Sequence, residues 1–99
     1  MADAFSVEVD DDVIRISGDL DAQTSSSLDE VITERLGGGA AEIVLDLSAL
    51  DFVDSSGLRS MVLARGPAGD GRVVLRSPST SVIRLLDITG LTEVFVIEP

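Results

Sequence analysis

The chain has 99 residues, enough for one domain that buries roughly two-thirds of the surface its unfolded chain exposes. Hydrophobic residues make up 44% of it and the three aromatics are all Phe, so Val, Ile and Leu must form the core. The net charge is −11, and no lysine is present. This charge disfavours binding to nucleic acid or to an anionic membrane, which need a basic patch, and favours a protein partner.

The missing residue types exclude several kinds of chemistry. Without cysteine, histidine and lysine the chain has no disulfide, no thiolate, no imidazole base and no phosphate-loop lysine. The start MADAFSVEVDDD is acidic and lacks the features of a signal peptide, and no apolar stretch reaches the ~20 residues of a membrane span. We expect a cytoplasmic protein that is not an enzyme and holds no cofactor or metal.

The first half of the chain predicts two strands, a helix and a buried strand. Apolar and polar residues alternate on either side of Asp10-Asp11-Asp12, which predicts two short strands around a solvated turn rather than a calcium loop. Residues 22–36 carry an apolar stripe at helical spacing, with Asp21 as the predicted N-cap and three glycines after the helix. The run Ile43-Val44-Leu45 predicts a central strand buried on both faces.

The second half predicts two more helices and two more strands. A helix is expected from Ser55 to about Arg65, then the loop GPAGDG and the strand RVVLR. The next helix is expected to have Ser77 as its N-cap and Pro78 in its first position, and EVFVIEP predicts a short last strand. Strands alternating with helices indicate a single α/β domain over residues 1–99, with a mainly parallel sheet after an antiparallel start.

Two adjacent serines follow an aspartate in the stretch LDFVDSSGL, between the buried strand and the second helix. The pattern differs from the G-x-S-x-G nucleophile elbow at Val53, and the chain has no histidine to act as base, so it does not indicate a hydrolase. Asp46 and Asp54 could both lie near strand ends and bind magnesium. In so acidic a chain, however, helix capping and solvation are the more common roles of two such residues.

Local physics leaves two interpretations of the serines open. In the first, Asp54 or Ser55 caps the helix and Gly57 permits close packing. In the second, one hydroxyl accepts a phosphate, which would meet the positive end of the helix dipole and free N–H donors. The phosphate would add about −1.5 to −2 charges to a surface that docks a partner.

Three segments, in their order and spacing, resemble the STAS domain and in particular the single-domain anti-sigma factor antagonists. They are SGDLDAQTS at 17–25, IVLDLSALDFVDSSGLRSMV at 43–62 and SPSTSVIRLLDITGLTEVFVI at 77–97. The resemblance implies parallel strands wound in succession, an antiparallel edge, and helices mainly on one face. The chain departs from the family where RGPAGDG replaces the last part of the second helix.

The resemblance also implies a regulatory function without catalysis. In this family the unphosphorylated antagonist binds an anti-sigma factor, typically a serine kinase, and thereby frees a sigma factor. The kinase then phosphorylates the antagonist, the complex separates, and a phosphatase resets it; ATP and magnesium belong to the kinase. When the phosphoacceptor of the family is carried over to this sequence, it is Ser55, directly after Asp54. The resemblance implies a partner-binding surface formed by Asp21, Asp54, Ser55, Ser56 and Gly57.

Two further expectations concern assembly and the alternative function. The high charge opposes self-association, so we expect a monomer. The alternative to a phosphorylation switch is a STAS module that serves as a scaffold or binds a ligand, with serines that are merely structural.

Overall fold

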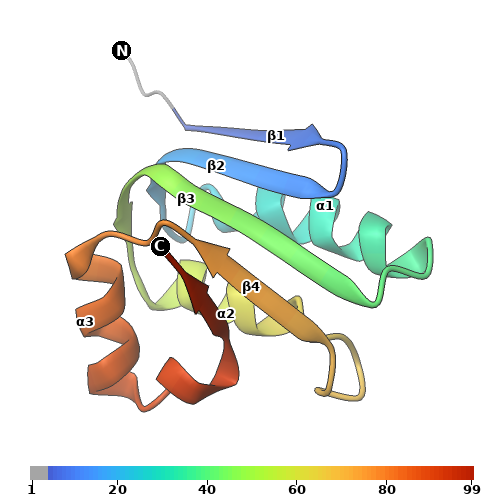
Figure 1. Cartoon of the computed structure of the whole chain (residues 1–99). Helices are drawn as coiled ribbons and strands as arrows, with labels where there is room; N and C mark the ends of the chain where they lie inside the picture. Colours follow the sequence, from blue (N-terminus) through green and yellow to red (C-terminus); the bar gives the residue numbers. More distant parts are fainter. Residues whose placement is uncertain (1–4) are drawn as a thin grey trace.

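The computed structural model describes residues 5–99, which form a curved five-stranded sheet with three α-helices (Figure 1). The strands are β1 (Ser6–Asp10), β2 (Val13–Leu20), β3 (Glu42–Val53), β4 (Arg72–Arg76) and β5 (Val96–Glu98), and the helices are α1 (Ser25–Gly37), α2 (Ser55–Leu63), α3 (Thr80–Thr89) and a 3-10 turn at Thr92–Val94. Residues 1–4 lie outside the described residues. They form part of the N-terminal stretch in which we expect no signal peptide.

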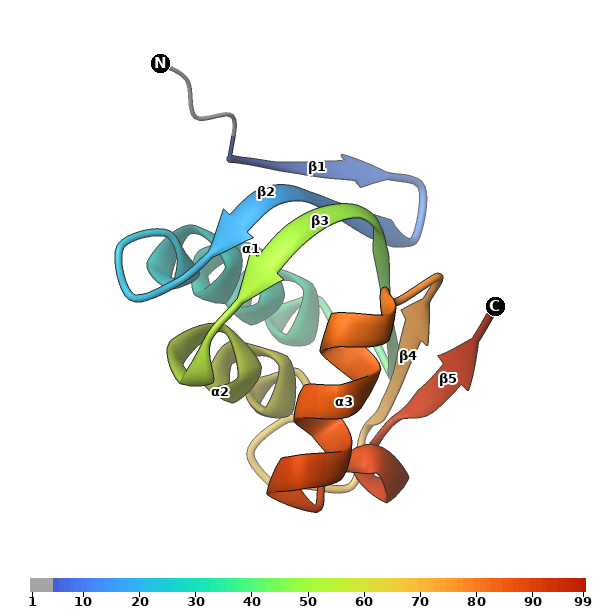
Figure 2. The same ribbon diagram turned by 90° about the vertical axis from the view of Figure 1, so that its left-hand side faces the viewer.

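The sheet order follows the chain, β1-β2-β3-β4-β5. β1 and β2 form an antiparallel hairpin, and every later neighbouring pair is parallel. Figure 2 shows α1, α2 and α3 on the same side of the curved sheet. The mainly parallel sheet, its antiparallel start and the one-sided helices confirm the predicted α/β class. Within residues 5–99, no helix is long and apolar enough to cross a lipid bilayer.

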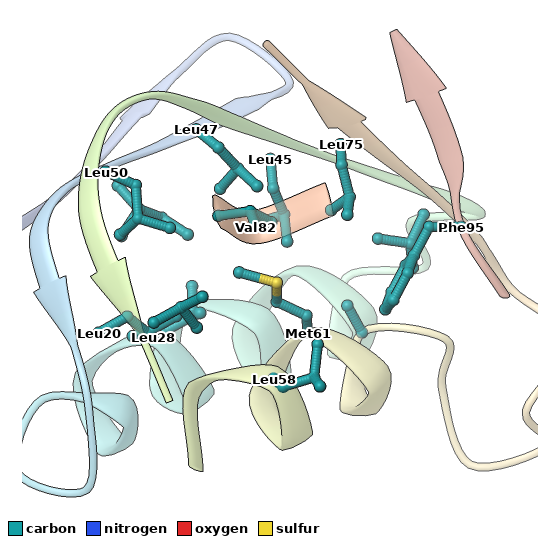
Figure 3. Packing of buried hydrophobic residues seen from close by; sticks show 14 of the residues in the cluster. Leu20, Leu28, Leu45, Leu47, Leu50, Leu58, Met61, Leu75, Val82 and Phe95 are labelled. Atoms are coloured by element: carbon teal, nitrogen blue, oxygen red, sulfur yellow. The ribbon is translucent and has the colours of Figure 1, made fainter. Parts of the chain in front are cut away.

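The hydrophobic core fills the space between the sheet and the helices (Figure 3). It is built from fully buried aliphatic side chains of both layers, among them Ile14, Ile16, Leu45, Leu47, Leu75, Leu28, Ile32, Met61 and Leu86. The predicted burial of Ile43-Val44-Leu45 is confirmed. Because side chains alternate along a strand, Val44 lies on the helix-free face, where its register neighbours Val13 and Val74 help to cover it.

β3 is much longer than the apolar run that predicts it, because it continues through Val53. Its register with β2 shifts between Arg15 and Ser17 and again between Gly18 and Asp19, and each shift inserts one extra residue into β3. The expectation that Asp46 lies near a strand end is therefore wrong. Asp46 sits within β3, eight residues before Asp54, the other residue of the magnesium-binding pair that the sequence allows.

Asp46 instead belongs to the helix-free face of the sheet. Its Oδ1 accepts the Ser48 amide at 2.9 Å, and its Oδ2 lies 3.5 Å from Nε of Arg15 on β2. The Ser48 hydrogen bonds, with help from Arg15, lower the pKa of the Asp46 carboxyl, although burial opposes them. Among residues 5–99, no three acidic side chains converge where they could hold a metal ion.

The start of α3 differs from the prediction by two residues. Ser79, not Ser77, is the N-cap, and its hydroxyl accepts a first-turn amide at 3.3 Å. Ser77 is held at the end of β4, because its own amide donates to the carbonyl of Glu98 on β5 at 2.9 Å, and it takes a left-handed φ of 56°. Pro78 therefore precedes the helix. The last strand is shorter than predicted, because the chain forms a 3-10 turn before it.

Candidate functional site

The segments that contain the predicted site residues come together at one end of the sheet. Leu20 and Val53 are register partners at the ends of β2 and β3. The amide of Asp54 donates to the carbonyl of Leu20 at 3.1 Å, which ties the two strand ends together. Because the strands are parallel, Asp21 and Asp54 leave the sheet at the same edge, and Ser55 follows directly.

Asp54 caps helix α2, which decides between the two capping residues that the sequence allows. Its backbone is extended, with φ −111° and ψ −170°, and its Oδ1 accepts the amides of Ser56 at 2.9 Å and Gly57 at 3.2 Å. Its carbonyl accepts the amide of Leu58 at 2.9 Å and so begins the helical hydrogen bonds. Ser55 is therefore free of a capping role and is the first helical residue.

The two adjacent serines have different surroundings. Ser55 is exposed, whereas Ser56 is half-buried and its carbonyl accepts the hydroxyl of Ser60 at 3.3 Å. Successive helical residues point about 100° apart, so a helix can expose one serine while the other meets a neighbouring helix. Ser56 lines a groove of about 430 Å³ between α1 and α2; the other lining residues are Ser25, Asp29, Arg59, Ser60, Val62 and Leu63.

Gly57 is buried and faces the ends of β2 and β3. A Cβ added to it would lie 2.6 Å from Cγ of Leu20 and 2.7 Å from Cγ2 of Val53. This position thus requires glycine for packing within the chain, as the structural interpretation holds. Burial leaves little of Gly57 to touch another protein, so its predicted contact with a partner stays a prediction.

Asp21 is not the N-cap of α1, which begins at Ser25, four residues later. Its Oδ1 accepts the amides of Gln23 at 2.9 Å and Thr24 at 3.1 Å, and its carbonyl accepts the amide of Ser25 at 2.8 Å. Asp21 therefore closes a turn between β2 and α1. The turn fixes the carboxylate, which is partly exposed, beside the strand end that leads to the serines.

An apolar groove that the sequence does not predict lies between the end of β3 and α3, next to the strand end that leads to Asp54. Phe52 at the end of β3 is 52% exposed, and Ile88 on α3 is 76% exposed. Both line a groove of about 330 Å³, together with Asp51, Val53, Ser81, Val82, Arg84 and Leu85. The signal in the sequence is weak, because a single Phe in a strand pattern is normally assigned to the core.

The chemistry available at Ser55 is limited. The chain has no histidine, lysine or cysteine, and the carboxylate of Asp54, which precedes Ser55 in the chain, is engaged with two helix amides. An exposed hydroxyl without a base does not act as a nucleophile towards a bound substrate. It can, however, be modified by another protein.

Comparison with known sequences identifies the family of the chain. Residues 4–99 match the sequence profile of the STAS domain. The chain belongs to the STAS domain family. Its sheet order and one-sided helices are therefore the STAS fold, as the resemblance implies.

Relatives of this STAS domain include proteins named as antagonists of anti-sigma factors. An anti-sigma F factor antagonist of Paenibacillus polymyxa is 36% identical over 92 residues, which cover 86% of this chain and 75% of that protein. A crystal structure of an anti-sigma factor antagonist from Mycobacterium paratuberculosis has a TM-score of 0.72 and 31% identity, covering 97% of this chain and 85% of that one. The antagonist SpoIIAA in its unphosphorylated form has a TM-score of 0.64 and 28% identity, covering 86% and 83%.

Proposed function

We propose that this STAS domain is an anti-sigma factor antagonist that works by partner switching in the cytoplasm. Its unphosphorylated form binds an anti-sigma factor of the serine kinase type, and this binding frees a sigma factor. Phosphorylation of Ser55 by the kinase ends the binding, and a serine phosphatase restores it. The antagonist itself is not an enzyme.

The placement of Ser55 carries the proposal. A kinase must reach the hydroxyl, and Ser55 is exposed at the first position of α2, whereas Ser56 faces the α1–α2 groove. In the reaction Oγ of Ser55 takes the γ-phosphoryl group of ATP bound to the kinase, ADP leaves, and the hydroxyl proton is released. The positive end of the helix dipole favours the new charge, so the modified domain keeps its fold.

The surface around Ser55 suits a partner with basic and apolar side chains. Asp21 and Asp54 supply carboxylates at the sheet edge, and the groove between Phe52 and Ile88 supplies apolar contact area. Where Ser55 meets apolar side chains of the partner, a dianionic phosphate loses water that no group of the partner protein replaces, which costs several kcal/mol. Phosphorylation would therefore separate the complex without unfolding either protein.

The known proteins support this assignment at the level of the family. A relative is named for antagonism of an anti-sigma factor, and a structural neighbour is described by its phosphorylation state.

The net charge of −11 fits a basic protein partner better than nucleic acid or an anionic membrane, and it favours a monomer. Sedimentation at micromolar concentration tests the monomer, which a tight dimer would contradict.

The test of the switch is incubation with candidate anti-sigma kinases and ATP, followed by intact-mass measurement and phosphopeptide mapping. The wild type and Ser56→Ala should each gain one phosphate, on Ser55. The matched variant Ser55→Ala should gain none, should still bind the anti-sigma factor, and should leave the switch permanently on. Phosphate on Ser56 with Ser55 unmodified would refute the site, and no phosphate with any kinase would favour a scaffold or ligand-binding module.

A further inference from the structure

Arg59 lies on α2 one helical turn after Ser55, and its side chain is exposed. Four of the other arginines form ion pairs with acidic side chains, namely Arg15, Arg35, Arg72 and Arg76. Arg59 has no ion pair with any residue in the described range 5–99. In a chain with eighteen acidic residues, an unpaired arginine beside the proposed phosphoacceptor is an available cation.

Asp29 on α1 presents the complementary feature. Its Oδ1 is buried and has no hydrogen-bond partner within the described part of the chain. Asp29 and Arg59 line the same groove between α1 and α2. Because a buried acceptor without a donor is costly, rotation of the Arg59 side chain towards Asp29 would satisfy both groups.

Arg59 also has the spacing needed to reach a phosphate on Ser55. Side chains at positions i and i+4 of an α-helix lie on the same face, with Cβ atoms about 5–6 Å apart. A guanidinium group can donate two parallel hydrogen bonds to a phosphate, and a dianionic phosphate attracts it more strongly than a single carboxylate does.

We propose that Arg59, which is unpaired among the described residues of this structure, turns to Asp29 while Ser55 is unmodified and becomes the internal counter-ion of the phosphate when Ser55 is modified. The inference rests on the proposed phosphorylation of Ser55. Only side-chain rotations are needed for the exchange. Phosphorylation then changes the charge at two places, because it adds a phosphate at the start of α2 and draws the Arg59 guanidinium away from the carboxylate of Asp29 in the α1–α2 groove.

The ionisation of the phosphate reports this contact directly. Asp54 precedes Ser55, and Asp21 leaves the neighbouring strand, so both carboxylates disfavour the second negative charge of the phosphate. Arg59 favours that charge. The two aspartates are the same in every variant compared, so a difference between variants isolates the effect of the arginine.

The first experiment uses protein in which phosphoserine is inserted at position 55 during translation, so that no kinase is required. The measurement is a phosphorus NMR titration of the phosphate group at low salt. In protein that is otherwise wild type, the midpoint of the second ionisation of the phosphate should lie a few tenths of a pH unit below the midpoint in Arg59→Gln. The difference should shrink at high salt. Arg84→Gln is the matched control, because Arg84 is also exposed and has no ion pair within residues 5–99. Equal midpoints in the wild type and Arg59→Gln would overturn the proposal.

The second experiment follows the Nε–H signal of Arg59, which Arg59→Gln identifies by its disappearance. Asp29→Asn should shift this signal in the unphosphorylated protein and leave it in place in the phosphoserine protein. A signal that does not respond to Asp29→Asn in either form would overturn the exchange. Both experiments are independent of the kinase test, so failure of a kinase to modify Ser55 would count against the proposed function alone.

Discussion

Gly57 on α2 and Leu20 at the end of β2 are in such close contact that a Cβ on the glycine would lie 2.8 Å from the leucine carbonyl oxygen. The contact partner is backbone, which cannot rotate away as a flexible side chain can. The same Cβ would also meet the side chains of Leu20 and Val53 at less than 3 Å. The start of α2, which carries the serines, is thus fixed directly against the ends of two strands.

We therefore expect Gly57→Ala to lower the free energy of unfolding by about 1–3 kcal/mol, the usual cost of overpacking. Urea unfolding measures this change. Gly37→Ala is the control, because Gly37 is also helical but an added Cβ meets nothing within 4 Å. That variant should be neutral or more stable by up to about 1 kcal/mol. Equal midpoints for the two variants would contradict the packing described for α2.

Leu45 and Val44 are neighbours in β3 but face opposite sides of the sheet. Leu45 is fully buried under the helices, so Leu45→Ala should cost about 3 kcal/mol, as expected for a cavity in a close-packed core. Val44 is 8% exposed on the helix-free face, so Val44→Ala should cost about 1 kcal/mol. Denaturant unfolding of both variants checks the difference. A larger loss for Val44→Ala would mean that the helix-free face contributes more to stability than its burial suggests.

The lowered pKa of the Asp46 carboxyl predicts a pH-dependent contribution to stability. A carboxyl with a lower pKa in the folded than in the unfolded state stabilises the fold above the unfolded value, about 3.9. This contribution is lost as the pH falls from about 4 towards the lower folded value. Asp46→Asn should therefore be less stable than the wild type at pH 7, and the difference should vanish in acid.

Urea unfolding from pH 7 down to pH 3 measures this contribution. Arg15→Gln is the comparison, because the Ser48 amide, and not Arg15, is the largest cause of the lowered pKa. That variant should keep most of the pH dependence. If Arg15→Gln loses as much of the pH dependence of stability as Asp46→Asn does, the ion pair with Arg15 is the dominant interaction.

Ser55→Asp separates the effect of charge on folding from its effect on binding. A carboxylate at the first position of a helix is favourable by about 0.3–1 kcal/mol, so the variant should unfold at the same or a higher urea concentration. It should nevertheless bind the anti-sigma factor much more weakly than Ser55→Ala does. Calorimetric titration with the partner measures this. Wild-type affinity in Ser55→Asp would show that charge at position 55 does not control the complex.

Much of the architecture can be predicted from short-range patterns. The alternation around the triple aspartate, the apolar run at Ile43-Val44-Leu45 and the helical stripe before three glycines each specify a local structure, because side-chain spacing decides which face can be buried. The start of α2 after Asp54 is equally local, since the two amides that the cap accepts are two and three residues after it. The absence of any base beside the serine pair is a matter of composition.

Other features depend on contacts between distant segments. The length of β3 follows from two register shifts against β2, which leave no trace in the hydrophobic pattern. Asp21 and Ser77 are both suitable caps, yet hydrogen bonds to a turn and to β5 hold them outside their helices.

The distinction between the serines also requires the fold. Ser55 and Ser56 are chemically identical, and only the packing of α1 against α2 leaves the first exposed and turns the second towards a groove. The proximity of Asp21 to Asp54 and the serine after it arises in the same way, because the thirty-two residues between the two aspartates (numbers 22–53) return the chain to the strand end at Leu20. Sequence neighbours interact through fixed covalent geometry, whereas these relationships depend on how the elements pack.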